Sequence, residues 1–265
     1  KNRFIKYFGV IGIFGPLVIL IYYTYVESWC LAYSAFSLAG KLKACATQEA
    51  MVDFLRSFQG LQKTPHFNGL WVAYFFFLVT FALNFFTVYF GIRAGIERIC
   101  KIALPLLFIM GLLLMLRVLT LGAPDPGQPS WSVGNGFGFL WNPDFNALKS
   151  ARVWLAAAGQ IFFTLSVGIG VILTYASYLK KSDDVALSGL SAAATNEFAE
   201  VIIGGSIIIP AAYAFFGPAG TAAVAKGGAF NLGFVAMPTI LRHVPLGDVF
   251  GFFWFLMLFL AGITS

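Results

Sequence analysis

Long apolar runs without a charged residue alternate with short polar segments along the whole chain. The clearest charge-free runs are residues 7–26, 67–92, 153–179 and 201–225. A helix needs about 20 residues to cross a bilayer, because the hydrocarbon is roughly 30 Å thick and each residue rises about 1.5 Å. Each of these runs therefore predicts a membrane-spanning helix.

The pattern predicts an all-α, polytopic membrane helical bundle in a single transmembrane domain over residues 1–265. The six predicted spans are residues 5–38, 68–91, 97–120, 153–180, 185–216 and 247–265. Residues 217–246 are too apolar for a solvated loop, so we expect a helical segment that re-enters the membrane or caps a cavity. The chain begins in a basic cluster and stops inside an apolar run, and we therefore expect a fragment truncated at both ends.

Composition supports this interpretation and excludes other classes of protein. Hydrophobic residues make up 59% of the chain and charged residues only 11%, whereas soluble domains carry about 25% charged residues. The net charge of +6 comes from only 17 Lys and Arg, without a basic run, so we expect no nucleic-acid partner. Three cysteines without a CxxC pair predict no metal cluster. No phosphate-binding loop or nucleophile triad is present, so we expect no enzyme.

Basic residues indicate the orientation in the membrane. The ends and loops on the side of the first residue hold Lys1, Arg3, Lys6, Arg93, Arg98, Lys101, Lys180 and Lys181. The other side holds a similar number, but short loops dense in positive charge carry the positive-inside signal. We therefore place Lys1 in the cytoplasm and predict a multi-pass protein of the cytoplasmic membrane, with the lipid bilayer as a partner.

The fourth span contains two glycines, Gly168 and Gly170, beside Thr164 and Ser166. Each glycine costs a helix interior about 1 kcal/mol relative to alanine. One interpretation is a helix broken near residues 166–170, with free N–H groups and carbonyls that bind an anionic group and a cation. The alternative is close packing of an unbroken helix through small residues.

The last two spans place polar groups in apolar surroundings. Asn196 and Glu200 are four apart and share a helix face, which favours ion or proton handling. The alternative is a wet helix end. At the end of the chain, the carbonyl of Ala261 and the hydroxyls of Thr264 and Ser265 group three uncharged oxygens that suit a monovalent cation. The alternative is ordinary hydrogen bonding of Ser265 to the helix backbone.

Five stretches together resemble the neurotransmitter:sodium symporter family, most closely its bacterial amino-acid members. The stretches are IYYTYVESW at residues 21–29, GQIFFTLS at 159–166, TYASY at 174–178, NEFAEVIIGGS at 196–206 and AFNLGF at 229–234. The similarity extends over essentially the whole chain. It implies the family's third to eighth helices, in a partial inverted-repeat transporter fold with one broken helix.

The resemblance also implies roles for individual residues. Thr164 and Asn196 match ligands of a first sodium site, and Ala261, Thr264 and Ser265 match the helix-eight half of a second. The implied substrate-binding residues are Ile19, Tyr23, Phe163, Thr164, Ser166, Ile169 and Ser265, with the Tyr23 hydroxyl on the substrate carboxylate and Phe163 as a lid. Gln160 and Tyr178 match gate residues.

The function implied is sodium-coupled symport of an amino acid by alternating access, with sodium ions as the required ions. Glu200 stands where chloride-dependent animal members have a serine, so we expect chloride-independent transport, with protonation of Glu200 in the return step. Ile19 and Ile169 depart from the residues of a bacterial member, which leaves the substrate open. The alternatives are an ion channel and a non-sodium amino-acid permease of related fold.

Overall fold

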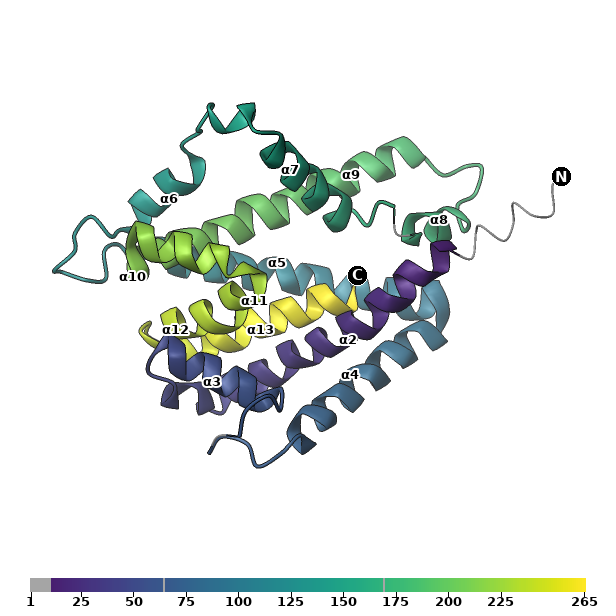
Figure 1. Cartoon of the computed structure of the whole chain (residues 1–265). Helices are drawn as coiled ribbons and strands as arrows, with labels where there is room; N and C mark the ends of the chain where they lie inside the picture. The colour runs from purple at the N-terminus through teal and green to yellow at the C-terminus, as the bar shows by residue number, and fades with distance from the viewer. Residues whose placement is uncertain (1–10, 64, 169) are drawn as a thin grey trace. The chain divides into compact units, whose positions relative to one another are not determined.

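The structure, a computed structural model, describes residues 11–63, 65–168 and 170–265, and its regular elements there are all helices (Figure 1). The first half contains α2 (Ile11–Leu38), α3 (Gln48–Phe58), α4 (Trp71–Tyr89), α5 (Glu97–Leu119) and α6 (Val133–Trp141). The second half contains α7 (Ala151–Thr164), α8 (Val171–Ala176), α9 (Val185–Glu197), α10 (Gly205–Lys226), α11 (Gly228–Asn231), α12 (Met237–Arg242) and α13 (Gly247–Ile263). The predicted basic cluster of Lys1, Arg3 and Lys6 lies outside the described residues.

Short helical turns of other kinds connect several of these helices. Two of them, η1 (Lys41–Ala44) and η3 (Ala147–Lys149), are short 3₁₀-helices with three residues per turn. The wider π-type turns are η2 (Ile92–Ile96), η4 (Phe198–Gly204) and η5 (Leu232–Ala236). Because η4 continues directly into α10, the segment from α9 to α10 forms one long helical run.

Within the described residues, four helical runs are long and apolar enough to cross a membrane. They are Phe14–Leu38, Trp71–Tyr89, Ile92–Leu119 and Val185–Lys226, and the shorter helix Gly247–Ile263 is also apolar. The all-α membrane class predicted from the apolar runs is therefore confirmed. The exact span boundaries and the single domain stay predictions.

The chain divides into two compact units. The first unit combines residues 1–23 with residues 142–202, and it holds α7, α8 and α9. The second unit combines residues 24–141 with residues 203–265, and it holds most of the remaining helices. The two sets of predicted ion ligands fall in different units, so each set is described within its own unit below.

An aromatic cluster forms the core of the second unit. Tyr33 of α2 is fully buried, and its ring centroid lies 5.6 Å from that of Phe54, 5.2 Å from that of Phe234 and 5.0 Å from that of Phe255. These partners come from α3, η5 and α13. Edge-to-face and tilted contacts of this kind stabilise a core beyond the apolar area they bury, so the cluster holds four elements together.

Small residues allow close helix packing elsewhere in this unit. A Cβ atom added to Gly136 of α6 would lie 2.6 Å from the Cα of Pro210 in α10. On α5, a Cβ at Gly111 would lie 3.0 Å from the side chain of Ile203. Glycine at such positions lets helix backbones approach closely, which is the usual packing device between membrane helices.

The helix α10 bends sharply at Gly217. The backbone there has φ 65° and ψ −177°, far from helical values, although helical residues precede and follow it. The ring of Trp131 lies where a Cβ atom at Gly217 would be. Glycine is therefore required at position 217 for two reasons: the backbone has a positive φ, and the indole leaves no room for a side chain. Beyond this bend, much of the segment predicted to re-enter the membrane or cap a cavity is helical.

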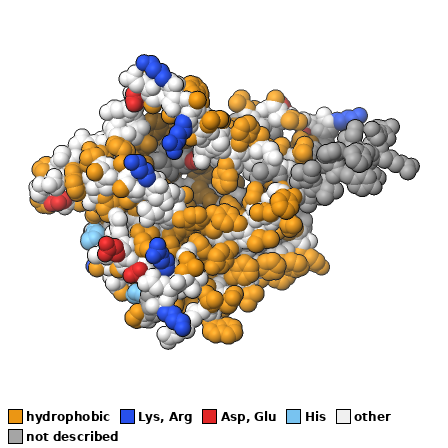
Figure 2. Space-filling model, in the orientation of Figure 1, with side chains coloured by type: hydrophobic (Ala, Val, Ile, Leu, Met, Phe, Trp, Pro, Cys, Tyr) orange, Lys and Arg blue, Asp and Glu red, His pale blue; other side chains and the backbone are white. Residues whose placement is uncertain are grey.

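Large apolar side chains cover the outer surface of α4. The side chains that are more than half exposed include Phe75, Leu78, Phe81, Phe85 and Phe86. Figure 2 shows such hydrophobic side chains gathered over this part of the second unit, with few charges among them. An apolar surface of this extent is unfavourable in water and matches lipid or further protein.

Candidate functional site

The helix predicted to be broken is broken in the structure. The helix α7 ends at Thr164 and α8 begins at Val171. Between them the backbone takes positive φ at Ser166 (55°), Gly168 (85°) and Gly170 (87°). A left-handed conformation is easy for glycine and uncommon for serine. The predicted break is therefore confirmed, and the alternative of an unbroken helix is wrong.

Four polar side chains of the first unit meet beside this break. The Thr164 hydroxyl donates to Oε2 of Glu200 at 2.5 Å and accepts from Nδ2 of Asn196 at 2.8 Å. The amide of Gln160 donates to Oε1 of Glu200. The same Asn196 nitrogen lies 3.4 Å from Oε2 of Glu200. Two helices far apart in the sequence thus share one hydrogen-bonded cluster.

The long helical run positions Glu200 away from a helix end. Asn196 lies in the last turn of α9, and Glu200 lies in the π-type turn η4 that continues into α10. Wide turns of this kind inside α-helices occur frequently at functional sites. Asn196, Thr164 and Glu200 are all partly buried. The cluster therefore offers a carboxyl group and two neutral oxygens in partly buried surroundings.

The final turn of the second unit also groups oxygen atoms. The Thr264 hydroxyl donates to the carbonyls of Leu260 at 2.8 Å and Ala261 at 3.2 Å. The Ser265 hydroxyl donates to the Ala261 carbonyl at 2.8 Å. The three oxygens therefore lie together as expected, and both hydroxyls also make the ordinary hydrogen bonds to the helix backbone that were the alternative interpretation. A hydroxyl that donates its proton keeps lone pairs that are free to bind a cation.

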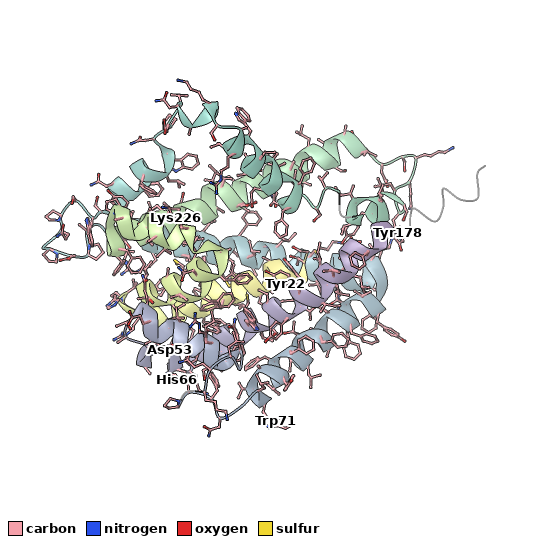
Figure 3. All side chains as sticks on the ribbon, in the orientation of Figure 1. Tyr22, Asp53, His66, Trp71, Tyr178 and Lys226 are labelled. Atoms are coloured by element: carbon pink, nitrogen blue, oxygen red, sulfur yellow. The ribbon has the colours of Figure 1, made fainter. Side chains whose placement is uncertain are left out.

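The predicted substrate and gate residues lie in the first unit, except Ser265, which lies in the second. Ile19 and Tyr23 on α2 are partly buried. Phe163 at the end of α7 is 64% exposed, and Tyr178 beyond α8 is 64% exposed; Tyr178 is labelled in Figure 3. Ser166 lies in the break itself. Ile169 lies outside the described residues, and the roles of all these residues stay predictions.

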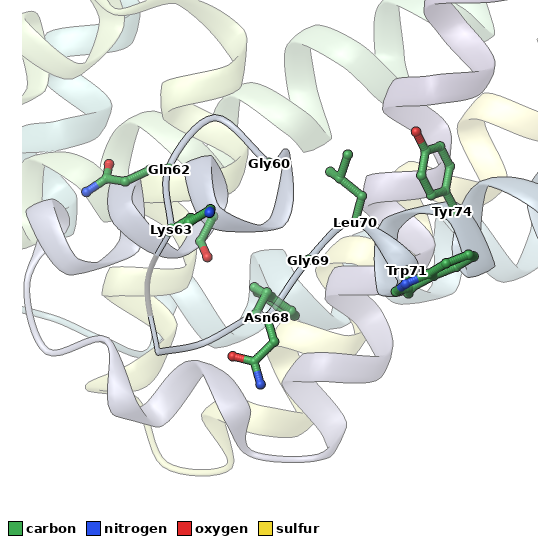
Figure 4. Close-up of a pocket in the computed structure, with 10 residues that line it drawn as sticks. Gly60, Gln62, Lys63, Asn68, Gly69, Leu70, Trp71 and Tyr74 are labelled. Carbon is green, nitrogen blue, oxygen red and sulfur yellow. The ribbon is translucent and has the colours of Figure 1, made fainter.

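A cavity of about 540 Å³ lies in the second unit, in the loop between α3 and α4 (Figure 4). Its lining includes Gln62, Lys63, Asn68, Trp71 and Tyr74. None of the residues predicted to bind substrate or sodium lines it. This cavity is therefore distinct from the candidate transport site.

The structure reveals a buried polar pair that the sequence reasoning missed. Glu27 of α2 is only 4% exposed, and its Oε2 accepts a hydrogen bond of 2.6 Å from Nδ2 of Asn84 in α4. Glu27 is the one charged residue between Phe14 and Leu38. That solitary carboxyl in an apolar span was a signal available in the sequence, since intramembrane acids mark functional sites.

An all-helical membrane protein with a helix broken at its centre, and polar groups gathered beside the break, has the architecture of a secondary transporter. A sequence model of the sodium:neurotransmitter symporter family matches residues 43–265. The chain belongs to this family, as its resemblance predicted. It is accordingly a multi-pass membrane protein from a family of transporters, not of enzymes.

Individual relatives support the same assignment. The chain is 31% identical to the uncharacterized sodium-dependent transporter YhdH of Bacillus subtilis, over 97% of this chain and 51% of that protein. It is 30% identical to an uncharacterized sodium-dependent transporter of Methanocaldococcus jannaschii, over 97% of this chain and 50% of that protein. The chain thus spans about half the length of these curated relatives.

A solved structure shows the same fold. The crystal structure of MhsT in complex with L-phenylalanine superposes with a TM-score of 0.75 and 31% sequence identity. The match covers 97% of this chain and 52% of the MhsT chain. The fold predicted from the resemblance, with its broken helix, is therefore confirmed over the length of the chain.

Proposed function

We propose that the natural full-length protein is a sodium-coupled amino-acid symporter that works by alternating access. The observation that carries the proposal is the hydrogen-bonded cluster of Thr164, Asn196 and Glu200 beside the broken helix. Relatives named as sodium-dependent transporters support the choice of ion. MhsT, crystallised with L-phenylalanine, supports an amino acid as the substrate.

The first proposed sodium site uses the oxygens of Thr164 and Asn196. The Asn196 nitrogen now donates to the Thr164 hydroxyl. A half turn of the amide about its terminal bond exchanges that nitrogen for the carbonyl oxygen, which is a suitable ligand for a hard cation. The neighbouring Glu200 carboxylate supplies negative charge within the same cluster. The carboxylate supplies the negative charge that a chloride ion supplies in chloride-dependent members of the family, so transport is proposed to be chloride-independent.

The second proposed sodium site uses the last turn of the chain. The carbonyl of Ala261 and the hydroxyls of Thr264 and Ser265 converge there. Three neutral oxygens supply only part of the coordination shell of a bare cation. The remaining ligands therefore come from other parts of the natural protein, and the two sites are filled together with the substrate.

The substrate is proposed to bind where the broken helix exposes backbone groups. Free N–H groups at the start of α8 favour an anionic carboxylate. The Tyr23 hydroxyl donates to that carboxylate, and Phe163 closes the pocket from outside. The proposed pocket lining is Ile19, Thr164, Ser166, Ile169 and Ser265, and the proposed gate residues are Gln160 and Tyr178.

Uptake into proteoliposomes containing the natural full-length protein tests this function. Each of the twenty amino acids is offered with a sodium gradient and with an equal potassium gradient. Saturable uptake that requires sodium supports the symporter. Saturable uptake without sodium supports the permease alternative, and a sodium current that needs no amino acid supports a channel. Either of the last two results overturns the proposal.

A further inference from the structure

Glu27 lies at the centre of an apolar span, in the seam where three helices of the second unit meet. Its Oε2 accepts from Asn84 of α4 at 2.6 Å, while its Oε1 is buried and has no hydrogen-bond partner. A Cβ atom added to Gly262 of α13 would lie 3.0 Å from the Cγ of Glu27. The carboxyl group is thus held by α4 on one side and covered by α13 on the other.

The described surroundings of Glu27 contain no basic residue. On α2, the titratable neighbours within one turn are Tyr23, Tyr25 and Cys30. The helix α4 carries no acid or base, only tyrosines near its two ends, and α13 carries only Asp248 at its opposite end. An ionised carboxylate here would have one hydrogen bond and no counter-charge. Burial of such a charge in a membrane span costs several kcal/mol.

A bound proton removes this cost because it neutralises the carboxylate. A metal ion would need further ligands, and the described residues do not supply them here. Asn84 presents an N–H donor to Oε2, and the facing position on α13 is a glycine that has no side-chain oxygen. An amide also suits both protonation states, because it donates to a carboxylate and, turned over, accepts from a carboxylic acid. We propose that Glu27 is a proton-binding site, a carboxylic acid held by Asn84 in the seam of α2, α4 and α13.

The second part of the inference rests on the proposed function and concerns sodium. Gly262 in the last turn of α13 directly follows Ala261, and Ser265 lies two residues beyond the end of this helix; Ala261 and Ser265 are proposed sodium ligands. Loss of the proton from Glu27 places a negative charge beside that turn, which favours a cation there. Proton and sodium therefore compete, and by reciprocity sodium binding at this turn promotes proton release from Glu27.

Infrared spectroscopy of the purified natural protein, without sodium, tests the proton site directly. A protonated carboxyl group in an apolar site gives a carbonyl stretching band separate from that of carboxylates. Glu27→Gln, which keeps the contact with Asn84, is expected to remove this band, and Asn84→Leu to shift it by removing the hydrogen bond. The matched control Glu49→Gln, on the exposed start of α3, is expected to leave it unchanged. An unchanged band in both the Glu27 and Asn84 variants overturns the proposal.

Sodium titration at a series of pH values tests the competition. In the wild type, sodium affinity is expected to rise with pH by up to about tenfold per unit, the limit for release of one proton per ion. Glu27→Gln is expected to give a flat profile. A slope that survives in Glu27→Gln and disappears in Glu200→Gln assigns the exchanged proton to Glu200 and overturns the competition. A wild type that binds no sodium at any pH contradicts the proposed function and leaves the infrared result to decide the proton site.

Discussion

The side chains of Thr164 and Asn196 are joined by a hydrogen bond of 2.8 Å between Oγ1 and Nδ2 across 32 positions of sequence. This bond connects the last residue of α7 with the last turn of α9. The two residues therefore act at one place, next to the helix break. Their contact is the geometric basis for the first proposed sodium site.

Replacement of Asn196 by alanine is expected to weaken sodium-dependent substrate binding. The change removes one neutral oxygen from the proposed ion site, and hydrogen bonds or ligand contacts to a charged group are worth about 1.5–3 kcal/mol, roughly 10- to 100-fold in affinity. Scintillation-proximity binding at varied sodium concentrations measures the effect. Asn146→Ala, in an exposed turn, is the control. Unchanged sodium dependence in Asn196→Ala would remove this residue from the ion site.

Glu200→Ser is expected to make transport respond to chloride. Serine removes the carboxylate that contacts Thr164 and Gln160, so an external anion is needed to supply the missing charge. Uptake with sodium chloride is compared with uptake in sodium gluconate. Glu197→Ser, at an exposed position of the same helical run, is expected to be indifferent to chloride. The same indifference in Glu200→Ser would count against replacement of chloride by the carboxylate.

Tyr23→Phe is expected to raise the substrate dissociation constant by about tenfold. The variant loses one hydroxyl, and a buried hydrogen bond to a charged carboxylate is worth roughly 1.4 kcal/mol or more. Equilibrium binding of the transported amino acid measures this dissociation constant. The control is Tyr25→Phe, whose ring packs against Trp29 in the same helix. Wild-type affinity in Tyr23→Phe would exclude the hydroxyl from substrate binding.

Gly136→Ala is expected to destabilise the protein by about 1–3 kcal/mol, the usual cost of overpacking. The added methyl group would lie 2.6 Å from backbone Cα of Pro210, which belongs to α10 and has little room to move. Thermal unfolding in detergent measures the change. Gly134→Ala, on the same helix α6, meets nothing nearer than 3.8 Å and is the matched control. Equal melting temperatures for the two variants would show that α6 and α10 do not pack this closely.

Much of the fold could be predicted because membrane helices have a simple sequence signal. Apolar length alone indicated the spans that became α2, α4 and α5, and the glycines at 168 and 170 indicated the break. The spacing of Asn196 and Glu200 indicated a shared face, whereas the partnership with Thr164 followed from the resemblance to the family. Local chemistry and family likeness thus indicated Thr164, Asn196 and Glu200, whereas the hydrogen bond from Gln160 to Glu200 was found only in the structure.

The pair of Glu27 and Asn84 could not be predicted in the same way. The two residues are 57 positions apart, so their contact depends on which faces of α2 and α4 meet. Helices that are apolar on all sides have no polar stripe to reveal the buried face. The sequence shows that each polar residue is unusual in its span, but only the packed structure shows that they are partners.

The bend at Gly217 shortens the straight length of the longest helical run. A straight rod of the 42 residues from Val185 to Lys226 would extend about 63 Å, roughly twice the depth of the hydrocarbon. The bend at this glycine redirects residues 217–226, about 15 Å of that length, and leaves residues 185–216, about 48 Å long, before it. The indole of Trp131 lies where a Cβ atom at Gly217 would be, so a larger residue at position 217 is expected to change the direction of the last ten residues of α10 relative to the part of the helix before the bend.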